Sequence, residues 1–295
     1  MDYQSELKNL KPEHDFFIGI DSDGCVFDTM EVKQKEFFIP NAIKYFDLFP
    51  VAKILRETWE FVNLYSCHRG VNRFPALLKV FELLEERCEI QESGFTLPNL
   101  LSLETWLKDE TRLSNTTLRI YYQSNPDHNL EKVLRWSEVV NKDISEWLHN
   151  IPPFPEASVA ISKLSSIADS IVVSQTPFEA LDREWKEHKV RSLVRILAGQ
   201  EHGTKAEHIK LAAKDKYADD KILIIGDALG DLDAARSNSV LFFPVIPGKE
   251  NISWKKLSEE GLNKFISGNY KGSYQDKLLN EFMGCLPANP PWKTC

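Results

Sequence analysis

Two carboxylates, Asp21 and Asp23, are separated by a single residue near the start of the chain. They follow a short apolar run at residues 16–20, which is typical of a strand buried on both faces. The pair would therefore lie at the carboxyl end of a strand, where open α/β sheets bind their ligands. One such carboxylate can attack as a nucleophile while the other carries a proton, provided that a cation screens their repulsion. The alternative is a polar turn in which Gly24 supplies a positive φ.

Two further polar residues stand next to expected helix starts. Ser174 ends an apolar run and precedes one such start, where a hydroxyl beside free backbone N–H groups can hold phosphate oxygens. Lys205 directly follows Thr204, which we expect to cap a helix. A cation in the first helical turn opposes the helix dipole, so a nearby anionic site would explain its placement. The alternatives are a serine that belongs only to a turn and an ordinary surface lysine.

A second acidic pair, Asp227 and Asp231, follows the apolar run at residues 222–226. Carboxylates that converge on one edge of a sheet suit Mg²⁺, which prefers oxygen ligands and uses few protein carboxylates. The pattern favours the ligand interpretation for Asp227. For Asp231 a helix cap is an alternative of almost equal weight.

A parallel sheet would bring these residues together. Five short apolar runs predict its strands, at residues 16–20, 170–174, 195–199, 222–226 and 241–246. Two helix starts can be read between them, because Thr176 and Thr204 are each followed three residues later by a glutamate, as in a capping box. Alternating strands and helices indicate an α/β fold with a doubly wound parallel sheet.

A large insert separates the first two predicted strands. Its apolar residues recur at helical spacing, which predicts an all-α domain over residues 30–150 beside a core of residues 1–29 and 151–295. We expect the tryptophans of the insert in its core, namely Trp59, Trp106, Trp136 and Trp147. Residues 254–267 and 274–283 predict two C-terminal helices that extend the core, and the Pro-rich end from residue 287 is expected to be attached loosely.

Taken in order, these motifs resemble those of the haloacid dehalogenase superfamily. They are Ile18-Gly19-Ile20-Asp21-Ser22-Asp23-Gly24, then Val172-Val173-Ser174, then Lys205, then Gly226-Asp227 with Asp231. Each motif is short, and their order and placement at element ends make the combination specific. The resemblance covers residues 16–28 and about 155–247, whereas the insert corresponds to a cap domain only in position and helical character.

The resemblance implies a phosphatase that depends on Mg²⁺ and forms an aspartyl-phosphate. Asp21 would attack phosphorus, and Asp23 would protonate the leaving oxygen and then activate water. Ser174 and Lys205, with Gln175 beside them, would hold the phosphoryl group. The metal would be bound by the Asp21 carboxylate, the Asp23 backbone carbonyl and Asp227, with support from Asp231 through water.

The acidic residue at position 23 argues against dehalogenase and phosphonatase chemistry, which in this superfamily lacks it. The leading hypothesis is therefore a phosphatase of a small phosphorylated metabolite. A phosphomutase of the β-phosphoglucomutase type would use the same two aspartates, and the sequence does not distinguish it. A non-catalytic protein that binds phosphorylated metabolites is a third possibility, which the presence of both Asp21 and Asp23 disfavours.

Within the insert, Arg69 and Arg73 are candidates for binding the rest of the substrate. They are four residues apart and could share a helical face that binds a phosphate, carboxylate or sugar. Gly70 between them weakens the helical assumption. A solvated basic turn that is salt-bridged to nearby glutamates is at least as good an interpretation.

Composition narrows the partners and the compartment. The formal net charge of −8 gives no general attraction to nucleic acid or an anionic membrane, so we expect neither as a partner. The resemblance implies a small phosphorylated metabolite as the partner, and we expect a monomer or homodimer. The first fourteen residues lack the apolar core of a signal peptide. Five widely spaced cysteines predict no disulfide framework, which favours a reducing cytoplasm.

Overall fold

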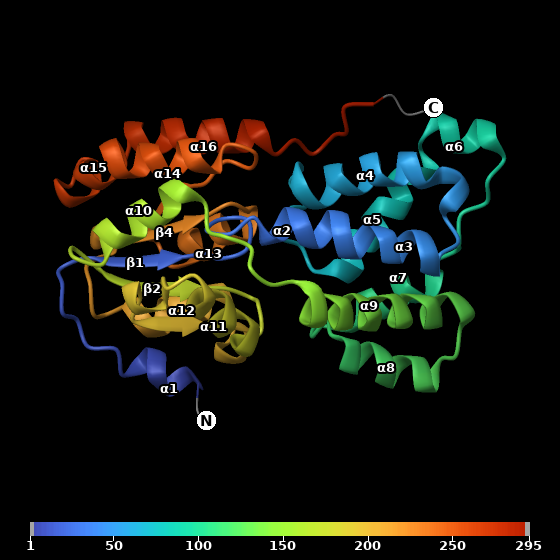
Figure 1. Cartoon of the computed structure of the whole chain (residues 1–295), viewed down its shortest axis with the longest axis horizontal. Coiled ribbons are helices and arrows are strands. Elements are labelled where there is room, and N and C mark those ends of the chain that lie inside the picture. The colour runs from blue at the N-terminus through green and yellow to red at the C-terminus, as the bar shows by residue number, and fades with distance from the viewer. Residues whose placement is uncertain (1–2, 293–295) are drawn as a thin grey trace. The chain divides into compact units, whose positions relative to one another are not determined.

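The computed structural model describes residues 3–292 and divides the chain into two compact units (Figure 1). The first unit comprises Met1–Met30 and His149–Leu286, and the second comprises Glu31–Leu148 and the chain from Pro287 onward. The insert therefore begins and ends within two residues of the predicted bounds. The prediction that the chain after residue 286 belongs to the core is wrong, because this segment groups with the insert.

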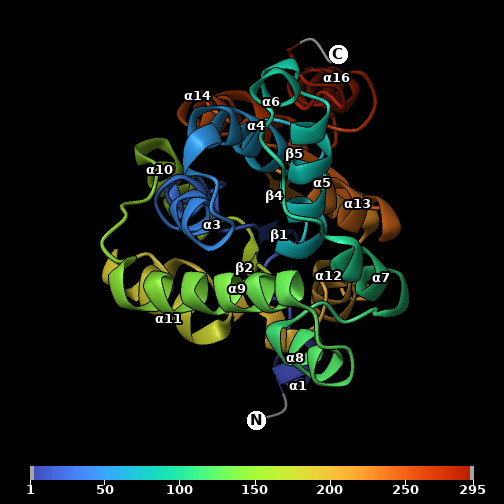
Figure 2. The same ribbon diagram turned by 90° about the vertical axis from the view of Figure 1, so that its right-hand side faces the viewer.

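The first unit contains a five-stranded parallel sheet with the order β3-β2-β1-β4-β5. Its strands are β1 (Phe17–Ile20), β2 (Asp169–Val173), β3 (Ile196–Ala198), β4 (Ile222–Gly226) and β5 (Leu241–Pro244). Figure 2 shows the order from β5 through β4 and β1 to β2. Ile20 pairs with Val172 on one side and Ile225 on the other, so the three central strands end within one residue of one another. The predicted doubly wound parallel sheet is confirmed.

Helices bury both faces of this sheet, which is why its strands read as unbroken apolar runs. The face that includes Ile20 and Val172 packs against α10 (Pro155–Leu164), α11 (Phe178–Glu187), α14 (Glu250–Lys256) and α15 (Leu262–Ile266). The face that includes Phe17 and Ile171 packs against α1 (Tyr3–Lys8), α12 (Lys205–Ala213) and α13 (Leu229–Ser237). Helix α16 (Ser273–Cys285) contributes to both cores.

Short helical segments complete the first unit. A π-helical segment, Leu257–Gly261, joins α14 to α15, and 3₁₀ turns occur at Arg191–Leu193, Gln200–His202 and Asp219–Lys221.

The C-terminal extension covers the outer edge of β5. The Tyr270 hydroxyl donates to the Phe242 carbonyl oxygen at 2.8 Å, and the Phe242 N–H donates to Gln275 Oε1 at 3.1 Å. An uncovered edge strand would offer these backbone groups to another chain. Gln275, in the second predicted C-terminal helix, and Tyr270, in the loop before it, therefore cover this edge of the sheet.

The second unit is built from helices, with no strand among its residues 31–148. They are the end of α2 (Thr29–Val32), a π-helical segment (Lys33–Phe38), α3 (Ile39–Tyr45), a 3₁₀ turn (Phe49–Val51), α4 (Ala52–Leu64), α5 (Arg73–Glu85), α6 (Cys88–Ser93), α7 (Leu101–Asp109), α8 (Asn115–Ser124) and α9 (His128–Trp147). Trp59, Trp106 and Trp136 are buried in one aromatic core, as predicted. Trp147 is 70% exposed at the end of α9, so its predicted core position is wrong.

The segment after α16 is packed against the second unit as far as Trp292. The Trp292 ring meets Phe61 edge-on at 5.3 Å, and the Arg87 guanidinium lies 4.5 Å from its centre. The Cys67 N–H donates to the Pro287 carbonyl oxygen at 3.3 Å. The prediction of a loosely attached end is therefore wrong up to this residue. The remaining residues of that prediction, 293–295, lie outside the described part of the chain.

Cysteine pairing differs from the sequence-based expectation. Cys25, Cys67 and Cys285 are free, whereas Cys88 at the start of α6 is disulfide-bonded. Its position in the chain gave no spacing signal for a bridge. Among residues 3–292, no helix is long and apolar enough to cross a membrane.

Candidate active site

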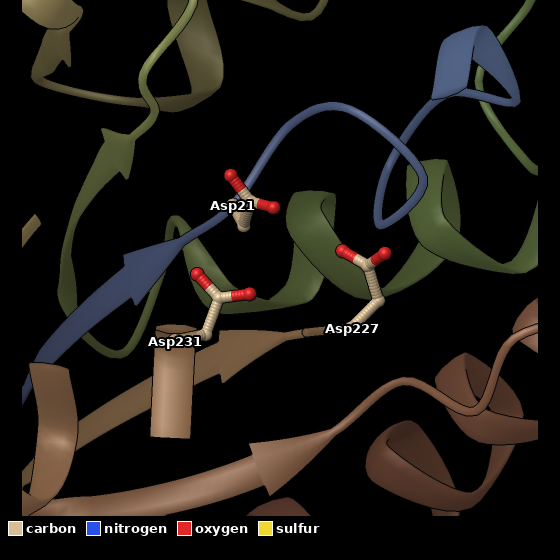
Figure 3. Close-up of side chains that lie close together, drawn as sticks. All are labelled: Asp21, Asp227 and Asp231. Carbon is tan, nitrogen blue, oxygen red and sulfur yellow. The ribbon is translucent and has the colours of Figure 1, made fainter. Parts of the chain in front are cut away.

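Three buried carboxylates meet at the carboxyl edge of the sheet. Asp21 directly follows β1, Asp227 directly follows the neighbouring β4, and Asp231 lies in the first turn of α13. One carboxylate oxygen from each lies within 4.8 Å of the others. Figure 3 shows the three side chains around the end of β1. The parallel register places Asp21 and Asp227 near each other, because they directly follow paired strands that end within one residue of one another.

The close approach of Asp231 depends on Gly226. A Cβ atom at Gly226 would lie 2.4 Å from both Cβ and Cγ of Asp231, which is too close for carbon atoms that are not bonded to each other. The Asp231 Oδ2 atom also accepts the Ala228 N–H at 3.1 Å, as in a helix cap. The helix-cap interpretation of Asp231 is therefore correct, and the same carboxylate also belongs to the acidic cluster.

Lys205 pairs with two of these carboxylates. Its Nζ atom lies 2.9 Å from Asp21 Oδ1 and 2.6 Å from Asp231 Oδ1. The predicted capping box of α12 is present, with reciprocal bonds between Thr204 and Glu207. Burial alone would lower the pKa of Lys205, but the carboxylates of Asp21 and Asp231 raise it above its usual value, so the side chain is charged. The anionic neighbourhood that its first-turn position suggested is present.

The charges of the cluster do not balance, since three buried carboxylates face one ammonium group. Burial raises the pKa of Asp21 well above its usual value, and the charges of Asp231 and Asp227 raise it further, against the opposing effect of Lys205. A divalent cation would correct this excess of negative charge. Closely spaced carboxylate oxygens are ligands that Mg²⁺ accepts. The donor set of Asp21, Asp227 and Asp231 therefore fits such an ion.

Both carboxylate oxygens of Asp23 accept hydroxyl hydrogen bonds. Thr29 Oγ1 donates to Oδ1 at 2.5 Å, and Thr176 Oγ1 donates to Oδ2 at 2.8 Å. These bonds orient Asp23 separately from the three-carboxylate cluster, to which its side chain does not belong. The bond from Thr176 spans 153 residues of chain, so the sequence gives no signal for this role of Thr176.

The predicted helix cap at Thr176 is wrong. Helix α11 begins at Phe178 after Pro177, and no side chain caps it from that position. The Phe178 N–H instead donates to Glu201 Oε2 at 2.9 Å. Since another carboxylate satisfies this helix N–H, the Thr176 hydroxyl is released for Asp23.

Ser174 and Gln175 follow β2 at the same edge of the sheet. Ser174 is buried, and its Oγ atom accepts the Thr176 N–H at 3.1 Å, so its own proton is available to a ligand. Gln175 is exposed, and its Nε2 atom donates to the Gly203 carbonyl oxygen at 3.0 Å. Gln175 thus joins the loop after β2 to the loop that leads into α12.

A tight turn joins the two catalytic candidates to the chain that leaves the unit. The Ser22 carbonyl oxygen accepts the N–H groups of Cys25, Val26 and Phe27, and Gly24 has a φ of 76°. The turn interpretation of Gly24 is therefore correct as well, and the turn carries both aspartates. The Phe154 N–H donates to the Val26 carbonyl oxygen at 2.8 Å, which ties the returning chain to this turn.

Arg69 and Arg73 belong to the second unit and lie largely inside it. Arg69 is 5% exposed and donates to the Leu64 carbonyl oxygen at 2.9 Å, near the end of α4. Arg73 donates to Ser137 on α9 and lies 4.9 Å from the Phe38 ring centre. Burial lowers the pKa of Arg73 to about 10. The interpretation as a solvated basic turn is therefore wrong, and substrate binding by these arginines stays a prediction.

Comparison with known proteins finds similar folds but no sequence relative. No protein-family model matches the sequence, and no curated protein matches it either. A proposed phosphoglycolate phosphatase from Lactobacillus delbrueckii matches with a TM-score of 0.49 and 18% identity, over 86% of this chain and 98% of its own. One from Haemophilus somnus matches with a TM-score of 0.47 and 15% identity, over 81% and 89%. A proposed β-phosphoglucomutase from Bacteroides vulgatus matches with a TM-score of 0.43 and 13% identity, over 92% and 99%.

Proposed function

We propose that this chain is a phosphohydrolase of the haloacid dehalogenase type, which removes a phosphoryl group from a small metabolite with Mg²⁺ and Asp21. The observation that carries the proposal is the convergence of Asp21, Asp227, Asp231 and Lys205 at the carboxyl edge of the sheet. A polar turn without a catalytic role would not require three buried carboxylates around one ammonium group. All four residues belong to the sequence motifs that resemble this superfamily.

The metal would be bound by Asp21 and Asp227, with Asp231 in direct contact or behind a water molecule and the Asp23 carbonyl oxygen as a further ligand. When bound, Mg²⁺ supplies positive charge that keeps Asp21 ionised and draws phosphate oxygens toward it. Lys205 contributes in the same sense, because its ammonium group already contacts Asp21 Oδ1. Electrostatic stabilisation and positioning are the main sources of catalysis in phosphoryl transfer.

In the first step, an Asp21 carboxylate oxygen attacks phosphorus and forms an aspartyl-phosphate as the bond to the ester oxygen breaks. Asp23, in its protonated form, gives its proton to the departing oxygen. In the second step, Asp23 takes a proton from water, which attacks phosphorus and restores Asp21 with release of inorganic phosphate. The hydroxyls of Thr29 and Thr176 fix the direction in which Asp23 points. The Ser174 hydroxyl would donate to a phosphoryl oxygen.

The proposal is tested by phosphate release from a panel of phosphate monoesters, with Mg²⁺ or with a chelator. Phosphoglycolate and glucose phosphates belong in the panel, since the names of similar structures mention such compounds. We expect release that needs Mg²⁺ and falls on the order of a thousandfold or more in Asp21→Asn. Asp233→Asn is the matched control, because Asp233 is exposed on α13 and should keep wild-type activity.

Two results would overturn the proposal. Activity that survives in Asp21→Asn would remove the nucleophile assignment. Conversion of one sugar phosphate into another without net phosphate release would favour the phosphomutase alternative, in which the phosphorylated enzyme is protected from water.

A further inference from the structure

Two tryptophans outside the catalytic set hold the turn that carries Asp21 and Asp23. Trp185 on α11 donates its indole N–H to Ser22 Oγ at 3.0 Å. Trp254 on α14 donates its indole N–H to the Cys25 carbonyl oxygen at 2.8 Å. Both indole rings are fully buried in the same core, on one face of the sheet. The turn is therefore held at two points, three residues apart, by two different helices.

The side chain of Ser22 has partners on both sides of its hydroxyl group. Its Oγ atom accepts from Trp185 and donates to Glu184 Oε2 at 3.3 Å. Ser22 is fully buried, so a hydroxyl without partners would cost free energy at this position. A serine in the middle of a buried turn is thus explained by the residues of α11 that face it.

Holding Ser22 also holds the two aspartates on either side of it. The Ser22 carbonyl oxygen accepts three N–H groups of the turn, and the Asp21 N–H donates to the Ile225 carbonyl oxygen at 2.9 Å. A shift of Ser22 would therefore move Asp23 relative to Asp21, because the hydrogen bond to Ile225 keeps Asp21 in place beside β4. The Cys25 carbonyl oxygen, at the far end of the turn, is fixed in the same way by Trp254.

We propose that Trp185 and Trp254 are positioning residues for the phosphoryl transfer, which act by setting the backbone between Asp21 and Asp23. Both indoles are fully buried, so the effect falls on the geometry of the attacking and proton-carrying groups. A displacement of about 1 Å in such groups can lower the rate on the order of a hundredfold. The inference rests on the proposed function for its effect on rate, while the hold on the turn can be measured without it.

The test uses Trp185→Phe and Trp254→Phe in the full chain. Phenylalanine keeps a buried aromatic ring and removes the N–H donor. The matched control is Trp106→Phe, because the Trp106 indole nitrogen is buried in the second unit without a hydrogen-bond partner. We expect kcat to fall at least tenfold in each of the first two variants while KM changes less than threefold, and the control to stay within twofold of wild type.

A second measurement reports on the turn itself. The amide nitrogen–hydrogen NMR signals of residues 21–27 should shift in Trp185→Phe and Trp254→Phe and stay unchanged in Trp106→Phe. The combination of Ser22→Ala with Trp185→Phe should lose little more activity than the larger single change, because both remove the same hydrogen bond.

The outcomes separate the two proposals. If the wild type releases no phosphate, the proposed function fails, and the NMR signals still decide whether the indoles hold the turn. If the wild type is active, unchanged turn signals would overturn the positioning role, as would a loss of kcat equal to that of the control. A lower melting temperature with unchanged kcat would show that the two tryptophans serve stability alone.

Discussion

At the scale of single residues, the geometry of the site depends on a carboxylate that serves two partners at once. Asp231 uses one oxygen for Lys205 and the other for the Ala228 N–H, so it is at once a helix cap and a member of the acidic cluster. This double use is possible only because Gly226 leaves space for the carboxylate. Residue identity at position 226 therefore controls the geometry of the cluster.

Gly226→Ala should disrupt the acidic cluster. The new Cβ atom would overlap Asp231 and force it away from Lys205, at a cost of about 1–3 kcal/mol in the free energy of unfolding. Urea unfolding measures this cost, and phosphate release should fall at least tenfold. Gly230→Ala is the control, because no atom lies within 4 Å of its Cβ position and alanine favours a helix. Equal effects of the two substitutions would contradict the steric argument.

Thr176→Val should lower catalysis while leaving the fold intact. Valine has nearly the shape of threonine but cannot donate to Asp23 Oδ2, so Asp23 would lose one of its two threonine donors. We expect kcat to fall about tenfold, which is less than the roughly hundredfold or more that a positioned proton carrier contributes, because Asp23 itself remains. Thr176→Ser keeps a hydroxyl and should retain most of the activity. A valine variant with the kcat of the wild type would mean that this hydrogen bond does not matter for the rate.

At the scale of elements, a buried aspartate anchors the N-terminal segment at the start of β2. Asp169 Oδ2 accepts the N–H groups of Glu13 and His14 and the Tyr217 hydroxyl, and Arg195 pairs with Oδ1 at 2.5 Å. Burial would raise the pKa of Asp169, but these hydrogen bonds lower it to about 2. Asp169 is at the opposite end of its strand from Ser174, so it serves the sheet and not the site.

Asp169→Asn should destabilise the fold in a pH-dependent way. The pKa of Asp169 falls from 3.8 to about 2 on folding, so the ionised form stabilises the fold above pH 4 and this contribution fades as the pH falls toward 2. We expect a loss of about 2 kcal/mol at pH 7, measured by urea unfolding, that shrinks at pH 2.5. Asp220→Asn, at an exposed residue, should change stability by less than about 0.5 kcal/mol. A loss that is the same at both pH values would exclude the charge of Asp169 as its cause.

At the scale of the whole molecule, the chain passes between its two units three times, after Met30, Leu148 and Leu286. An insert alone would need only the first two passages. The third follows α16, whose Phe282 is buried in the first unit, and leads to Trp292 on the second. The end of the described chain is therefore part of the core of the helical unit.

Trp292→Ala should destabilise the second unit. The change removes the edge-on contact with Phe61 and the ring beneath Arg87, with an expected loss of about 1–2 kcal/mol for a partly buried aromatic residue. Hydrogen exchange of α4 should become faster, because Phe61 lies on that helix. Trp147→Ala is the control, since Trp147 is mostly exposed at the end of α9. Exchange rates of α4 that are alike in both variants would show that the segment adds no stability.

The sequence by itself determined the features that arise from neighbouring residues. The five strands and the Thr204–Glu207 capping box follow from local hydrophobic runs and short hydrogen bonds, and the structure has them within one or two residues. The neighbouring ends of β1 and β4 then bring Asp21 and Asp227 together, because parallel strands share one carboxyl edge. These inferences need no knowledge of side-chain packing.

Only the tertiary structure decided which distant groups meet. The partner of the Thr176 hydroxyl is 153 residues away, and the carbonyl held by Trp254 is 229 residues away. The placement of Trp292 in the helical unit depends likewise on packing against Phe61 and not on its Pro-rich surroundings. Hydrogen bonds and ring contacts of this kind depend on which groups the fold brings near one another. A single sequence lists the groups that could form them but does not give the distances between them.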